Sequence, residues 1–390
     1  MKIILIEGEN VERIYLDHAA TSPMHPRAIE KMLEVMKSAF GNPSSIHSFG
    51  REARHLIDLA RSELAGSIGA KETEIIFTSG GTEADNMALF GVAETYQHKG
   101  KHIITSEVEH HAVLHACKRL EKMGFEVTYL PVDKTGRISI DDLRAALRED
   151  TILVSIMYGN NEVGTLQPIT EIGQLLKDHQ AMFHTDAVQA YGVEQIDVNQ
   201  SFIDLLSVSA HKINGPKGTG FLYARSNVKL SPRSFGGEQE RKRRAGTENI
   251  AAIVGFHEAV LIASENREAK REQFIELKRT LVDKLHELDV EFDINGLLEN
   301  SLPHVLNLSF PGTSVEAMLV NLDLAGIAVS SGSACTAGSI EPSHVLVAMF
   351  GKNSERLTNS IRFSFGYNTT VEEVIKAAEE TARIVSRLKK

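Results

Sequence analysis

A lysine near the middle of the chain, in residues 204–220 (DLLSVSAHKINGPKGTG), is the first candidate for chemistry. An apolar run ends in Ser209, His211 and Lys212, and a Gly/Pro loop and a second apolar run follow. This order predicts a strand, a lysine, a loop and a second strand. An amine beside a hydroxyl, an imidazole and a glycine loop suits a Schiff-base site with an anion nearby. A solvated loop lysine is the common alternative, and the rest of the chain must decide between the two.

Cys335 is a second candidate for chemistry, in the Ser/Gly/Ala-rich stretch 328–344. No apolar periodicity surrounds it, so we expect an exposed thiol, as a nucleophile that must travel requires. Loop composition alone leaves an incidental thiol open as the alternative. The other cysteine, Cys117, lies in a helical pattern and is expected to be packed.

Polar side chains also follow the two apolar runs that precede the lysine stretch. Asn161 comes after the run 152–157, and Asp186 ends the run 181–186, with Gln189 shortly after it. In an open α/β sheet, ligands bind outside the carboxyl ends of the strands. Polar groups from three successive strands therefore predict one site.

A glycine turn at residues 79–82 (SGGT) follows the predicted strand 75–78 and leads into a helix predicted from Met87. Small residues between a strand and a helix leave backbone N–H groups free to bind an anion. The turn is not a Walker loop, because no Gly-Lys-Ser/Thr ends it.

Histidines are concentrated in residues 109–115 (EHHAVLH), after the predicted strand 102–105. His111 and His115 have the spacing of a metal pair on a helix, but no third ligand has a matching position, so we expect no metal. A single histidine stacked on a ring is the better functional interpretation.

The elements that must position these groups alternate from Glu74 onward between strands and helices, which predicts a mostly parallel sheet with crossover helices. Amphipathic patterns predict two helices before this region and a largely helical stretch after it. A charge-rich junction then separates a second, smaller α+β domain. The helices are 26–40, 51–69 and within 250–288, the junction is 265–272, and the second domain holds the strands 304–310 and 361–365 and the helix 372–388.

Composition limits the class of protein. The 390 residues carry a formal net charge of −10, and this acidic balance disfavours binding to a nucleic-acid backbone. Two cysteines are too few for a disulfide framework and suit a reducing cytosol. The first residues lack the apolar core of a signal peptide, and no apolar run approaches the roughly 18 residues that span a bilayer. We expect a soluble cytoplasmic protein with no membrane or direct nucleic-acid binding.

A long loop at residues 234–249 contains the basic run 241–244 (RKRR) among acids and glycines. This mixture favours a loop that clamps something anionic over a nucleic-acid patch. A solvated surface is an equally good interpretation of the charges alone.

Together these motifs resemble the NifS/IscS group of cysteine desulfurases, enzymes of the class-V aminotransferase family that use pyridoxal 5'-phosphate (PLP). The resemblance runs from about Tyr15 to the C-terminus. The motifs that carry it are YLDHAAT (15–21), GNPSS (41–45), FTSGGTE (77–83), EH (109–110), NNEVG (160–164), HTDAVQ (184–189), SAHK (209–212), RAGT (244–247), SGSACT (331–336) and IRFSFG (361–366).

The resemblance implies an α/β protein of PLP-dependent transferase fold type I, which is aspartate-aminotransferase-like. A large domain with a mainly parallel sheet is expected over 15–262, and a smaller α+β domain over 1–14 and 263–390. The small domain would carry the cysteine loop. A homodimer is expected as well.

The resemblance also implies roles for single residues. Lys212 would bind PLP and move the substrate's Cα proton, His110 would stack on the ring, and Cys335 would accept the sulfur as a persulfide. The cofactor-binding residues would be Gly81, Thr82, Asp186, Gln189, Ser209, His211, Lys212 and, reaching the other subunit, Thr247. Asn161 and Arg362, with help from Asn42, would bind the substrate carboxylate.

The expected reaction converts L-cysteine to L-alanine and passes the sulfur to an acceptor protein. The acceptor would be a tRNA 2-thiouridylase-like enzyme or an iron–sulfur scaffold. A selenocysteine lyase, or another PLP lyase of the same fold, is the alternative enzyme. A sulfur-relay scaffold with little turnover is the alternative of another class.

Overall fold

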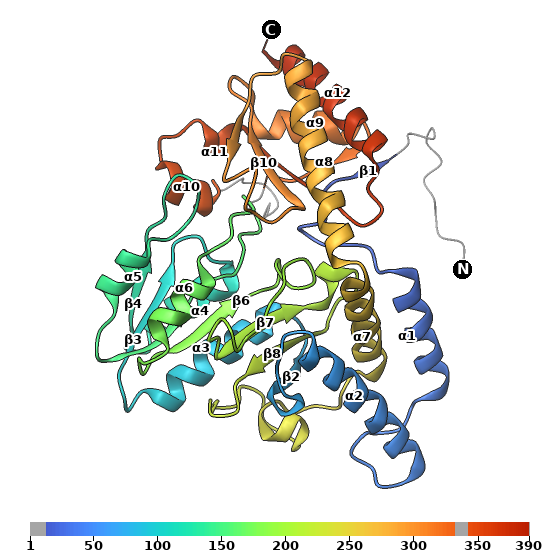
Figure 1. The fold of residues 1–390 in the computed structure, drawn as a ribbon, viewed down its shortest axis with the longest axis vertical. Coiled ribbons are helices and arrows are strands. Elements are labelled where there is room, and N and C mark those ends of the chain that lie inside the picture. The colour runs from blue at the N-terminus through green and yellow to red at the C-terminus, as the bar shows by residue number, and fades with distance from the viewer. Residues whose placement is uncertain (1–12, 332–341, 390) are drawn as a thin grey trace.

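The computed structural model describes residues 13–331 and 342–389. The polypeptide forms a lower part built around a large sheet and an upper part with two small sheets and several helices (Figure 1). Cys335 lies outside the described residues.

Seven strands form the large sheet, in the order β2-β8-β7-β6-β5-β3-β4. The strands β7, β6, β5, β3 and β4 are parallel, and β8 is antiparallel to both of its neighbours. The mostly parallel sheet predicted from the alternating pattern is therefore confirmed. The strands are β2 (Ile75–Thr78), β3 (His102–Ser106), β4 (Glu126–Leu130), β5 (Thr151–Ser155), β6 (Met182–Asp186), β7 (Leu205–Ser209) and β8 (Gly220–Ala224).

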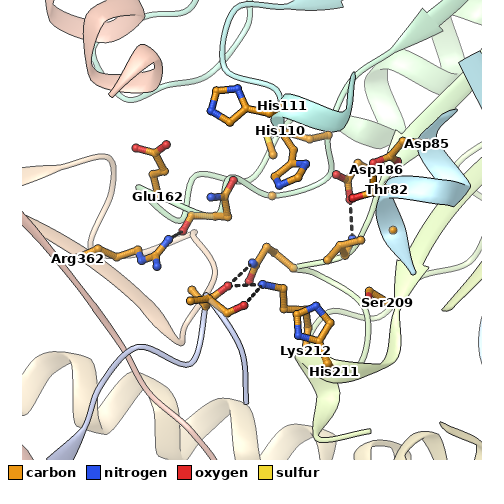
Figure 2. A pocket seen from close by; sticks show the side chains of 18 of the residues that line it. Thr82, Asp85, His110, His111, Glu162, Asp186, Ser209, His211, Lys212 and Arg362 are labelled. Atoms are coloured by element: carbon orange, nitrogen blue, oxygen red, sulfur yellow. Dashed lines mark hydrogen bonds between the residues drawn. The ribbon is translucent and has the colours of Figure 1, made fainter. Parts of the chain in front are cut away.

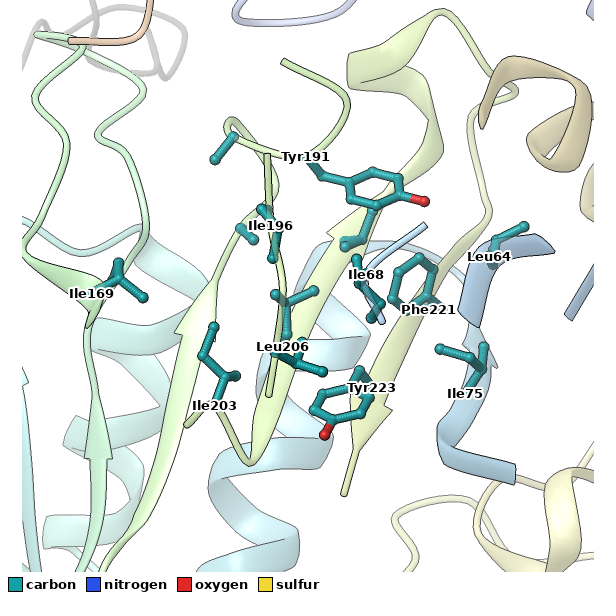
Figure 3. Close-up of a cluster of buried hydrophobic side chains, with 14 of the residues drawn as sticks. Leu64, Ile68, Ile75, Ile169, Tyr191, Ile196, Ile203, Leu206, Phe221 and Tyr223 are labelled. Carbon is teal, nitrogen blue, oxygen red and sulfur yellow. The ribbon is translucent and has the colours of Figure 1, made fainter. Parts of the chain in front are cut away.

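The central strands are buried along their whole length, because helices cover both faces of a parallel sheet. Around β8, the rings of Tyr191, Phe221 and Phe256 pack against one another, with Tyr191 and Phe221 centroids 5.5 Å apart. Figure 3 shows Tyr191 and Phe221 with the aliphatic side chains of Leu206 and Ile75, which belong to the same apolar cluster. This packing fixes the strand ends that carry the polar groups.

Helices surround the large sheet, and one of them begins earlier than the sequence pattern indicates. The helix predicted from Met87 begins at Gly81, because Gly80 adopts φ +146° and lets the chain turn directly from β2 into the helix. The helices are α1 (Pro26–Ser38), α2 (Ser48–Gly66), α3 (Gly81–Tyr96), α4 (His111–Glu121), α5 (Ile140–Ala146), α6 (Ile169–Leu176) and α7 (Ile250–Glu265).

The upper part contains an antiparallel sheet of order β12-β10-β9 and the parallel pair β1-β11. Its own apolar cluster joins residues of β1 with residues of α8 and α12. The elements are β1 (Ile14–Tyr15), α8 (Arg267–Glu287), β9 (Asp293–Asn295), β10 (Val305–Ser309), α9 (Val315–Leu324), β11 (Ile327–Ala328), α10 (His344–Phe350), α11 (Arg356–Asn359), β12 (Ser360–Ser364) and α12 (Val371–Leu388).

We propose the boundary between the two parts as predicted. The large domain comprises residues 15–262, and the small domain comprises residues 1–14 and 263–390. A break in the helical backbone supports a junction near it, since Asn266 separates α7 from α8 with φ −132° and ψ 25°. Across 13–331 and 342–389, none of the helices combines the length and apolar character needed to cross a membrane.

Candidate active site

A cavity of about 370 Å³ opens at the carboxyl ends of the central strands. Figure 2 shows its lining, with Asp85 and Asp186 at one side, Arg362 at the other, and Lys212 between them. Ten of the side chains singled out from the sequence line this cavity: Gly81, Thr82, His110, Asn161, Asp186, Gln189, Ser209, His211, Lys212 and Arg362.

Lys212 lies on a short 3-10 turn (Ala210–Ile213) that follows β7 directly. Its Nζ donates hydrogen bonds to the carbonyl oxygens of Ala19, at 2.5 Å, and Ala20, at 2.7 Å. Burial, together with the nearby Arg362, lowers the pKa of Lys212 to about 8, although the carboxylates of Asp186 and Asp17 oppose this shift. The amine can therefore lose its proton close to neutral pH and act as a nucleophile toward an aldehyde.

Two carboxyl groups, Asp186 and Asp85, lie side by side under the cavity. An oxygen of each lies within 4.8 Å of the other and of a ring nitrogen of His110. Burial raises the pKa of both, and the pKa of Asp85 also rises because Asp186 is its neighbour, whereas His110 and Lys212 lower that of Asp186. A buried acid of this kind suits a protonated ring nitrogen, whose charge would compensate the carboxylate.

The amino end of α3 faces the same cavity and can bind an anion. The first N–H groups of a helix have no acceptor within it, and no side chain caps this one at Gly80. A Cβ at Gly81 would come within 2.6 Å of the Val188 side chain, so this position accepts only glycine without rearrangement. The Ser209 hydroxyl and the His211 ring complete a cradle for a phosphate.

Arg362 and Asn161 form the opposite wall of the cavity. The Arg362 guanidinium donates from Nη1 to the Asn161 carbonyl oxygen, at 3.0 Å, and from Nη2 to Asp17, at 2.7 Å. Its Nε is buried and has no hydrogen-bond partner among residues 13–331 and 342–389. A guanidinium with an unused donor suits a carboxylate ligand.

Other residues of the site were missed from the sequence. Asp85 lies one helical turn beyond Thr82 on α3, so the turn motif and helical spacing could have identified it. Glu162 is buried beside the cavity and accepts a hydrogen bond from Ser343, and His344 Nε2 donates to the Glu109 carbonyl oxygen at 2.9 Å. These contacts join segments far apart in the chain, which no local motif reveals.

Two of the expected site residues do not line the cavity as this chain forms it. Asn42 is exposed and accepts a hydrogen bond from the Ser44 N–H, and Thr247 is exposed on its loop. Neither lines the cavity. The described residues do not include Cys335, so its position is not given. Cys117 is buried as expected, and burial raises the pKa of its thiol.

The donor set fits PLP. The amine of Lys212, with its lowered pKa, suits the aldehyde, and the buried carboxylate of Asp186 suits the pyridine nitrogen. The amino end of α3, with the side chains of Ser209 and His211, suits the phosphate. The His110 ring lies at the wall, where it could stack on the cofactor ring.

Comparison with known proteins gives consistent matches over nearly the whole chain. The family model described as aminotransferase class-V matches residues 14–376. A putative cysteine desulfurase IscS 1 of Bacillus subtilis is 64% identical, with 97% of this chain and 100% of that protein covered. A cysteine desulfurase IscS of Dictyoglomus turgidum is 49% identical, with 96% and 95% covered. Among solved structures, a NifS-like protein has a TM-score of 0.90 and 37% identity, with 96% and 100% covered. The expected PLP fold type I is confirmed by these matches.

Proposed function

The chain belongs to the class-V aminotransferase family and is a PLP-dependent cysteine desulfurase, and from this premise we propose which residues carry the reaction and where the sulfur goes. The observation that carries the proposal is the convergence of Lys212, Asp186 and the amino end of α3 on one cavity.

Lys212 would hold the cofactor covalently and would move the proton of the substrate Cα. PLP supplies an electron sink when bound. Asp186 would keep the ring nitrogen protonated, Gln189 would donate to the phenolate oxygen, and His110 would stack on the ring. Gly81, Thr82, Ser209 and His211 would hold the phosphate. The pKa of Lys212, lowered to about 8, supports its part, because a base must give up its own proton first.

Arg362 binds the substrate carboxylate, with the Asn161 side chain beside it. The guanidinium of Arg362 supports this role, because Nη1 and Nη2 each carry a second N–H beside the one donated to Asn161 or Asp17. Binding of the carboxylate at this wall would hold the substrate in the same cavity as Lys212.

Cys335 receives the sulfur. Its thiolate attacks the sulfur of the bound cysteine, the substrate C–S bond breaks, and the electron pair of that bond remains with the carbon, which becomes alanine after protonation. The sum is L-cysteine plus the Cys335 thiol giving L-alanine plus the Cys335 persulfide. The persulfide then passes to an acceptor protein.

Two substitutions test these roles. Lys212→Ala should abolish the covalent cofactor link, seen as loss of the yellow chromophore, because no other amine takes its place. Cys335→Ala should keep the chromophore and lose sulfide release from cysteine. Release at the wild-type rate by Cys335→Ala would refute the persulfide route while leaving the cofactor site intact.

A homodimer would explain why Asn42 and Thr247 lie outside the cavity of their own chain. Arg54 on α2 donates to the Pro43 carbonyl at 3.3 Å and to Glu248 at 3.1 Å, so the loops that carry Asn42 and Thr247 are neighbours. We propose that the two loops together reach the partner's cavity. There Thr247 would bind the phosphate and Asn42 would assist at the substrate carboxylate.

The acceptor and the compartment are the remaining parts of the proposal. A cytoplasmic enzyme would pass its persulfide to a tRNA-thiolating enzyme or to an iron–sulfur scaffold. Transfer of labelled sulfur from the protein to both acceptors, measured side by side, would discriminate between them. Equal transfer to both would argue for a general sulfur donor.

A further inference from the structure

His304, in the segment that leads into β10, contacts Gln189, a residue that lines the cofactor cavity, from the upper part of the molecule. Its Nε2 lies 3.3 Å from Oε1 of Gln189, a residue 115 positions away in the chain. His304 itself does not line the cavity. It therefore reaches the cofactor site only through Gln189.

The amide of Gln189 can have only one orientation. One end of it donates to the carbonyl oxygen of Ala19, at 3.0 Å, and a carbonyl cannot donate, so this end must be the NH2 group. The other end is then the amide oxygen, which can only accept. The ring nitrogen of His304 that faces it must therefore carry the hydrogen.

The surroundings of His304 agree with a neutral ring protonated at Nε2. Burial lowers the pKa of His304 to about 3, and the nearby Lys270, Lys278, His18 and Lys212 lower it too. The opposite nitrogen, Nδ1, is buried and has no hydrogen-bond partner in the described part of the chain, as expected for a lone pair. The Phe274 ring packs against the imidazole, with the two ring centroids 5.9 Å apart.

We propose that His304 is a positioning residue that fixes the amide of Gln189, so that the second amide hydrogen points at the phenolate oxygen of PLP. Without the donor at Nε2, the amide oxygen would be buried and unsatisfied, and the amide could turn and present oxygen to oxygen. The inference rests on the proposed contact between Gln189 and the cofactor. It adds a connection between the upper part of the molecule and the electronic state of the cofactor.

The test follows the pH titration of the bound cofactor by absorption, and the affinity of the apoprotein for PLP. His304→Phe removes the donor and keeps a ring of similar shape, whereas His304→Gln keeps an N–H donor near the Nε2 position. Phe274→Leu is the matched control, because Phe274 packs on His304 but has no hydrogen bond to Gln189. Gln189→Leu shows the effect of losing the amide itself.

Loss of one hydrogen bond to the phenolate oxygen makes that oxygen more basic, so His304→Phe should move the titration midpoint upward by about 1 pH unit. It should also weaken PLP binding by roughly 3- to 10-fold. Gln189→Leu should also raise the titration midpoint and weaken PLP binding. In His304→Gln and Phe274→Leu, both quantities should remain close to the wild-type values.

The variants distinguish a failure of the Gln189–PLP contact from a failure of the positioning role of His304. If Gln189→Leu changes neither the midpoint nor the affinity, the contact between Gln189 and PLP is wrong. If Gln189→Leu shifts both but His304→Phe behaves like Phe274→Leu, the role of His304 is wrong. Nitrogen-15 NMR of histidine-labelled wild-type protein gives a check that needs no variant to fold. The Nε2–H tautomer is expected, and an Nδ1–H tautomer would overturn the inference.

Discussion

Lys212 rests on two backbone carbonyls, those of Ala19 and Ala20, and none of the ion pairs among the described residues includes it. A carbonyl stabilises the ammonium less than a carboxylate in contact would, so burial and Arg362 keep its pKa low. The amine is thereby prepared for covalent chemistry before the cofactor arrives.

The rate at which the apoprotein takes up PLP should therefore depend on pH around Lys212. Because its pKa is lowered to about 8, the neutral amine predominates above that pH and the rate should rise through it. Arg362→Gln removes a neighbouring positive charge, which raises the pKa of Lys212 and moves the midpoint to higher pH. Stopped-flow absorption at a series of pH values measures both. A midpoint unchanged by Arg362→Gln would show that burial alone sets the pKa.

Single residues of the site differ in how well the sequence predicts them. Lys212, Asp186 and Asn161 could be found because each follows an apolar strand, and parallel strands bring their carboxyl ends together. Asp85 was missed because the helix was predicted only from Met87, so its place one helical turn beyond Thr82 was not recognised. His304 was missed because its contact with Gln189 joins residues 115 positions apart, and only packing brings them together.

At the scale of elements, the strands of the large sheet match their predicted positions closely, because buried parallel strands are read as short apolar runs. The start of α3 differs by several residues, because a glycine cap rather than an apolar periodicity decides it. The loop that carries Thr247 was predicted only as irregular. Its residues Glu240, Arg241 and Lys242 all have positive φ, and none is a glycine or asparagine that would indicate this.

A buried ion pair explains how that loop holds such a conformation. Glu240 accepts two hydrogen bonds from Arg61 on α2, at 2.8 and 2.7 Å, and a third from the Phe77 N–H, at 3.0 Å. The side chains of Glu240 and Arg61 are only 2% and 11% exposed. The loop is therefore fastened to α2 and β2 at one point.

Glu240→Gln should destabilise the protein by about 3–5 kcal/mol, the usual cost of removing one charge of a buried ion pair. Urea unfolding measures this. Glu238→Gln in the same loop is the control, because its partner Lys242 and Glu238 itself are 70% and 78% exposed, and it should change stability by less than about 1 kcal/mol. Equal effects of the two substitutions would mean that the buried pair does not hold the loop.

At the scale of the whole molecule, the surface beside the Asn42 loop is unusually apolar. Phe40 and Ile46 are 78% and 90% exposed, and Phe235, on the neighbouring loop, is 86% exposed. The Phe40 ring centroid lies 5.2 Å from that of Phe49, which is also exposed, and exposed apolar groups that lie together mark an interaction surface. A second copy of the chain would bury them and bring Thr247 to the partner's cavity.

Phe40→Glu and Ile46→Glu should therefore weaken the proposed dimer, because each would place an unpaired charge in the interface, at a cost of roughly 1–3 kcal/mol or about 5- to 150-fold in dissociation constant. Sedimentation equilibrium measures the dimer. Leu324→Glu on α9, at a side chain that is 76% exposed, is the control and should leave it unchanged. If all three proteins remain dimeric, the interface lies elsewhere, and the assignment of Thr247 to the partner's site loses its support.

The parallel pair β1-β11 limits how this chain could be recombined with its relatives. Residues 14 and 15 pair with residues 327 and 328, and the Leu16 carbonyl accepts a hydrogen bond from the Ser364 N–H at 2.8 Å. A chimaera that takes residues 267–389 from another member of the family would have to take residues 14–16 from the same parent. Residues 14–16 and 267–389 would therefore have to be exchanged together, although most residues that line the cofactor cavity lie between them in the sequence.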